Sequence, residues 1–152
     1  MSYTNAQARQ RLLDALAQAT NDIALAVANL TAAYEQVDDD AADRLEAQLF
    51  RPLQSAYGQA QRTYSEFARE HAMPVRSFGA GEAHVRDHDA LGAIEAAATA
   101  IARADLELGT LQDSMLPVEV GDPPLRAGLE QVRVLLGAIR ERARALERTL
   151  GR

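Results

Sequence analysis

Apolar residues recur every three or four positions along four stretches of the chain, the spacing that is typical of amphipathic α-helices. The clearest stretch runs from Pro124 to Leu150, where the apolar positions alternate steps of four and three without a break. These positions are Leu125, Leu129, Val132, Leu136, Ile139, Ala143, Leu146 and Leu150. Such a seam has to be buried against other helices, so the pattern predicts a helical bundle.

A first helix is predicted to begin at Thr4 and to continue to about residue 36. Thr4 and Gln7 match a capping box, in which a hydroxyl group and a glutamine bind the first free N–H groups of a helix. Up to position 34, the only charges along the apolar line are Asp14 and Asp22, and we expect both carboxylates to be exposed. The line consists of Leu12, Leu16, Ala19, Ile23, Val27, Leu30, Tyr34 and Val37.

A second helix is predicted from Ala41 to His71, behind three aspartates at positions 38–40 that suit its N-terminus. Pro52 lies inside it and removes one backbone hydrogen bond. We therefore expect a kink near Phe50 to Leu53, or two shorter helices that meet there. The predicted core positions are Leu45, Leu49, Leu53, Tyr57, Ala60, Tyr64 and Phe67.

Residues 72–88 show no helical period and contain a proline and two glycines. A connection of about 17 residues is long for a compact domain, where links of about 4–6 residues are usual. It could be a crossover along the bundle, a functional flap or a disordered segment. Its apolar residues favour partial packing; they are Met73, Val75, Phe78 and Val85.

A third helix is predicted to start behind Asp87 or Asp89 and to reach about Met115. An alanine run at 96–100 gives it little bulk, so a neighbouring helix can approach closely. Residues 116–123 are predicted to form a turn, in which Asp122 caps the last helix. The seam of the third helix is Leu91, Ile94, Ala98, Ile101, Ala104, Leu108, Leu111 and Met115.

The predicted fold class is therefore all-α: an elongated antiparallel four-helix bundle made of two helical hairpins joined by the long loop at 72–88. The short links within each hairpin make its two helices antiparallel neighbours. We expect residues 1–152 to form a single domain.

Composition excludes several functions. The chain has no cysteine, and all 16 of its basic residues are arginine. Thiolate metal sites, cysteine nucleophiles and Schiff-base lysines are therefore excluded. With a net charge of −6 and no strongly apolar segment of membrane-spanning length, we expect no binding to nucleic acid and no membrane span. The absence of cysteine and of a basic-then-apolar leader favours a cytoplasmic location.

Three groups of residues are candidates for binding. Tyr57 and Tyr64 lie one heptad apart and, with Phe78, could line a ligand pocket; plain core packing is the alternative. His84 and His88, four residues apart, could share a metal ion if the segment is helical; surface histidines beside capping aspartates are the alternative.

The third group is a basic stripe on the last helix, well away from its apolar seam. It would suit an acidic protein partner, whereas a solvated helix flank with local ion pairs is the alternative. The stripe consists of Arg126, Arg133, Arg140, Arg144 and Arg148.

The sequence contains no Glu-x-x-His motif for a di-iron site, no nucleophile elbow and no phosphate-binding loop. We therefore expect no cofactor and, rather than an enzyme, a helical bundle that acts through protein–protein contacts or self-association, as a homodimer. The alternative is a small-molecule- or metal-binding bundle with a site near the 72–88 loop and the Tyr57/Tyr64 row.

Overall fold

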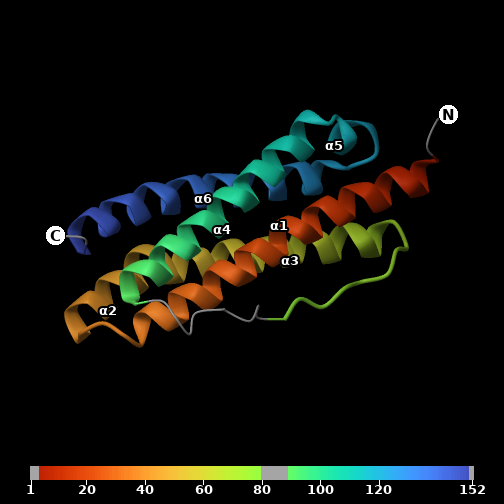
Figure 1. The fold of residues 1–152 in the computed structure, drawn as a ribbon. Coiled ribbons are helices and arrows are strands. Elements are labelled where there is room, and N and C mark those ends of the chain that lie inside the picture. The colour runs from red at the N-terminus through yellow and green to blue at the C-terminus, as the bar shows by residue number, and fades with distance from the viewer. Residues whose placement is uncertain (1–3, 80–88, 151–152) are drawn as a thin grey trace.

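The computed structural model describes residues 4–79 and 89–150, and within these ranges all regular secondary structure is helical. Long helices run along one elongated bundle (Figure 1), which confirms the predicted all-α fold. They are α1 (Asn5–Tyr34), α3 (Arg51–Glu70), α4 (Ala90–Asp113) and α6 (Pro123–Leu150). Within these ranges, no helix is long and apolar enough to cross a membrane.

Polar side chains cap the N-termini of the four predicted helices, as the sequence predicted. Thr4 forms the complete capping box with Gln7 at the start of α1. The other starts are aspartates whose carboxylates accept a backbone N–H three residues later, at 2.7–2.8 Å: Asp38, Asp89 and Asp122. Each cap satisfies one of the N–H groups that a helix leaves free in its first turn.

The predicted second helix is interrupted, as Pro52 required. It consists of α2 (Asp39–Leu45), a π-helical turn (Glu46–Phe50) and α3, which has the proline in its first turn. The interruption thus begins at Glu46, one turn before the predicted kink. The carbonyl of Gln48, four residues before Pro52, accepts a hydrogen bond from Arg142 of α6 at 3.3 Å. This bond ties the irregular turn to the last helix.

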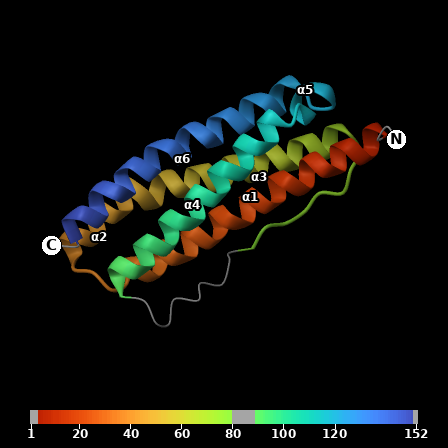
Figure 2. The same cartoon turned by 45° about the horizontal axis from the view of Figure 1, so that its top comes forward.

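The connection between α3 and α4 is a crossover. α1 packs against α3 and α4, and α6 packs against the same two helices. Figures 1 and 2 show α3 ending at one end of the bundle and α4 beginning at the other. α3 and α4 therefore run in the same direction, and each long helix is antiparallel to both helices that it contacts. Bundles with a single crossover of this kind form a known class.

The most extensive helix pair is α1 with α4. Both helices present small residues to the interface, so their backbones can approach closely. The buried alanines of α4 are Ala93, Ala97, Ala100 and Ala104. Those of α1 include Ala19, Ala26 and Ala33. Most of the buried alanines among the described residues lie in these two helices.

The apolar seam of α6 is buried along its described length. Each of its seam positions from Leu125 to Leu146 is at most 8% exposed. The side chain of Leu150 lies outside the described part of the chain. Two other predicted core positions are wrong. Tyr34, the last residue of α1, is 40% exposed, and Met115 is 49% exposed.

The misplacement of Met115 has a local cause. α4 ends at Asp113, where the hydroxyl of Ser114 donates to the carbonyl of Leu111 at 2.6 Å. Met115 then adopts a left-handed backbone with φ of 69°, so the helix ends two residues before the apolar period does. The predicted turn at 116–123 contains a short helix, α5 (Leu116–Glu119).

Candidate interaction site

The aromatic row on α3 is covered by the chain itself. Phe78 packs edge-on against Tyr64 with ring centroids 5.2 Å apart, and the hydroxyl of Tyr57 donates to the carbonyl of Gly79 at 3.2 Å. Burial raises the pKa of both tyrosines. The structure thus brings the three predicted residues together, with Phe78 and Gly79 in direct contact with the two tyrosines.

The basic stripe of α6 is divided between two environments. Arg133 and Arg140 both bind Asp105 of α4, at 2.9 and 3.1 Å, and Arg126 donates to the carbonyl of Pro117 at 3.0 Å. These three arginines join α6 to the α4–α5 region. Arg144 and Arg148 are exposed on the last turns of α6. Most of the predicted partner-binding stripe therefore has an internal use.

The predicted metal ligands His84 and His88 lie outside the described residues. Within 4–79 and 89–150, no cluster of three or more histidine, aspartate or glutamate side chains is arranged to hold a metal ion. The described histidine, His71, contacts Asp122 at 3.2 Å and packs edge-on against the ring of Phe67.

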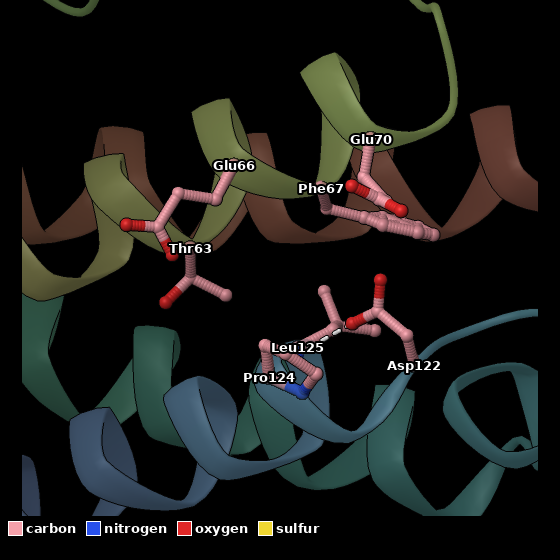
Figure 3. Close-up of a pocket in the computed structure, with 7 residues that line it drawn as sticks. All are labelled: Thr63, Glu66, Phe67, Glu70, Asp122, Pro124 and Leu125. Atoms are coloured by element: carbon pink, nitrogen blue, oxygen red, sulfur yellow. Dashed lines mark hydrogen bonds between the residues drawn. The ribbon is translucent and has the colours of Figure 1, made fainter.

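A hollow of about 340 Å³ lies between the end of α3 and the start of α6 (Figure 3). Glu66 and Glu70 project into it from α3, and Asp122 does so from the other side. Asp122 already caps α6 and pairs with His71. The other two carboxylates are on exposed residues. This acidic hollow therefore needs no ligand to account for its residues.

A second hollow, of about 430 Å³, lies between α1, α4 and α5, and we call it the α1/α4 groove. Its volume is within the range of about 300–1,000 Å³ that is usual for binding sites. The lining is mainly apolar or uncharged: Arg11, Ala15, Gln18, Leu106, Glu107, Thr110, Leu111, Ser114 and Leu116. Leu106 at its edge is 71% exposed, the largest exposed fraction among the large apolar residues described.

Beneath the groove, two carboxyl groups meet. Asp22 of α1 is only 6% exposed, so the prediction that it is exposed is wrong. Its neighbour across the helix interface is Glu107 of α4, within hydrogen-bonding reach. Asp22 Oδ2 and Glu107 Oε2 are both buried, and neither has a donor in the structure. Arg103 lies 3.6 Å from the other oxygen of Asp22 but is half exposed.

The pKa of Glu107 is raised to about 7: burial is the largest cause, the hydrogen bond and negative charge of Asp22 also raise it, and Arg103 lowers it. Protonated Glu107 can donate its O–H to Asp22, which gives each buried oxygen a partner. Two adjacent charged carboxylates would instead repel each other in a medium of low dielectric constant. Below about pH 7 the pair therefore holds a proton at the α1–α4 interface, and above that pH the proton is lost.

The sequence alone did not single out the groove or Glu107. Arg11, Ala15, Gln18 and Asp22 are spaced by threes and fours, so they share one face of α1. The partner of this face depends on which helix the crossover places beside it, and no local pattern shows this.

The described residues thus form an all-α bundle with a mainly apolar groove between α1, α4 and α5. The sequence matches no protein-family model and no curated protein, and no solved structure matches the chain.

Proposed function

We propose that this protein is a non-enzymatic interaction module that self-associates through the α1/α4 groove, with a second copy of the chain as the occupant. The observation that carries the proposal is the exposure of Leu106 beside a hollow lined by Leu111, Leu116 and Ala15. On either side of Leu116 in the sequence, Met115 and Val118 are also about half exposed. Large apolar side chains that are exposed beside an apolar hollow are typical of interaction sites.

A projecting side chain beside a hollow suits a symmetric pair. In a two-fold dimer, the same surface patch of each chain faces its copy, so a projection on one chain meets the hollow on the other. Leu106 and the groove that it borders meet this requirement, since each copy supplies both parts.

The charge of the groove also favours a second copy. The whole chain carries a net charge of −6, so most pairings of two copies would be repulsive. Arg11 and Glu107 are the two groove-lining residues of charged type, and they have opposite signs. These two charges cancel when Glu107 is ionised and leave one positive charge when it is protonated, so in neither state does the groove add to the negative charge that opposes the pairing of two acidic chains.

The test is sedimentation equilibrium over a wide range of protein concentration, with Leu106→Glu as the disrupting variant. A matched control is Val134→Glu, because Val134 is 63% exposed and lines a hollow with residues of α3 on the other side of the bundle. We expect wild type and Val134→Glu to dimerise and Leu106→Glu to stay monomeric, with unchanged helical circular dichroism in all three.

A wild-type chain that stays monomeric at every concentration overturns the proposal. So does a dimer that Val134→Glu disrupts and Leu106→Glu does not. In the monomeric case, a thermal shift with an apolar small molecule that is lost in Leu106→Glu would assign the groove to a small ligand instead.

A further inference from the structure

The Asp22–Glu107 pair lies at the same place as the proposed contact surface. Glu107 lines the groove, while its buried oxygen lies in the α1–α4 interface next to Asp22. A partner molecule that covers the groove therefore removes water from Glu107 without contacting Asp22. Loss of water disfavours the charged form of a carboxyl group more than the neutral form.

Covering the groove and protonating the pair are thus coupled. If two copies meet there, each Glu107 loses part of its remaining solvation, and its neutral form becomes more favourable in the dimer than in the monomer. By thermodynamic linkage, whatever favours the protonated form must then favour the dimer by the same factor.

We infer that self-association through the α1/α4 groove takes up protons at the Asp22–Glu107 pair, so that the dimer forms at acidic and neutral pH and dissociates at alkaline pH. This inference rests on the proposed function and adds its regulation. The second copy is the partner, and the proton is the ligand that controls its binding.

The other charged groups around the pair do not titrate in this range. Asp22 faces Glu107 from α1, and Arg103 does so from α4 itself; Arg11 of α1 also lines the groove. The groove-lining residue of α5 is Leu116, which is uncharged. Arginine stays protonated well above neutral pH, so a change in affinity near pH 7 at this site reports on the two carboxyl groups.

The experiment measures the dimer dissociation constant by sedimentation velocity from about pH 5.5 to about pH 9, a range that brackets the raised pKa of Glu107. We expect a nearly constant value below about pH 7. Above it, the dimer should weaken by up to about tenfold per pH unit for each proton released. Calorimetry of dimer dilution in two buffers of different ionisation heat would count the protons directly.

Two variants assign the effect. Glu107→Gln keeps a hydrogen-bond donor to Asp22 but cannot lose it, so its dimer should persist across the range with an affinity like that of wild type at low pH. Glu95→Gln changes an exposed glutamate on the same helix and should keep the wild-type pH dependence. Circular dichroism at each pH checks that all chains stay folded.

The two proposals fail differently. A wild-type dimer whose affinity does not change with pH overturns this inference and leaves self-association intact. A pH dependence that survives in Glu107→Gln assigns the effect to other groups, such as histidines, and also overturns it. A chain that forms no dimer at any pH overturns the proposed function itself.

Discussion

Two carboxylates on opposite flanks of α4 are neutralised in different ways. On one flank, Asp105 faces α6 and receives two arginines, Arg133 and Arg140. On the other flank, two residues later, Glu107 faces α1 and meets a second acid, Asp22. The first acid is neutralised by fixed positive charge, whereas the second is neutralised by a proton.

The difference shows which contacts of the bundle can respond to conditions. An arginine–carboxylate contact keeps its charges at every physiological pH and acts as a fixed clamp between helices. A shared proton can leave, and the contact then becomes repulsive. α4 thus makes a permanent polar contact with α6 and a pH-dependent polar contact with α1, and the exposed groove lies on the side of the pH-dependent contact.

The largest effect on stability is expected at the contact between Asp105 and its two arginines. Replacing both arginines by methionine (Arg133→Met with Arg140→Met) keeps their aliphatic stems but leaves Asp105 largely buried without a partner. We expect a loss of about 2–3 kcal/mol in the free energy of unfolding, measured by denaturant titration. Adding Asp105→Asn should restore part of it, because the unpaired charge is then gone. An unchanged stability in the double variant would show that the clamp contributes nothing.

A smaller, pH-dependent effect is expected on the other flank. Because the pKa of Glu107 is raised in the folded chain to about 7 from an ordinary value near 4.5, the folded chain holds its proton more tightly than the unfolded one. This contribution to stability is complete below about pH 4.5 and is lost as pH rises through about 7. We expect a loss of about 2 kcal/mol for a partly exposed side chain.

Denaturant titrations at about pH 5 and about pH 8 measure this loss. Glu107→Gln should largely remove the difference and be more stable than wild type at the higher pH, whereas Glu95→Gln should behave like wild type. A wild-type chain that is equally stable at both values, or a Glu107→Gln chain with the wild-type slope, contradicts this interpretation of the pair.

The smallest effect is expected at the exposed end of the arginine stripe. Among the described residues, neither Arg144 nor Arg148 has a hydrogen bond or ion pair with another helix. Arg144→Met with Arg148→Met removes the same number of charges as the clamp variant. It should change stability by no more than about 0.5 kcal/mol. An equal loss in both double variants would mean that net charge, and not the contact with Asp105, determines the cost.

Local features were predictable from the sequence, and features of the groove were not. The helix caps at Thr4, Asp89 and Asp122 depend on residues within one turn, so they could be predicted from the local sequence. The burial of Asp22 depends on α4, which is 68 residues or more further along the chain and arrives by the crossover. A carboxylate within an otherwise apolar stretch was the available signal, but without the helix pairing it did not distinguish burial from exposure.

The binding candidates illustrate the same limit. Tyr57, Tyr64 and Phe78 were correctly grouped, but the sequence could not show that the crossing segment fills the space beside them. The arginine stripe was correctly placed on one flank of the last helix. Its internal use follows from Asp105, whose position opposite Arg133 and Arg140 is fixed by the packing of α4 on α6.

The most direct test of the pH-dependent contact is a ¹³C NMR titration of the side-chain carboxyl carbon of Glu107 in the intact chain, with Asp22→Asn for comparison. Our account predicts a midpoint near pH 7 for wild type and a clearly lower one for Asp22→Asn, which removes the neighbouring negative charge. A midpoint near the ordinary glutamate value of about 4.3 in both chains would show that no proton is shared, and would contradict the account of this interface.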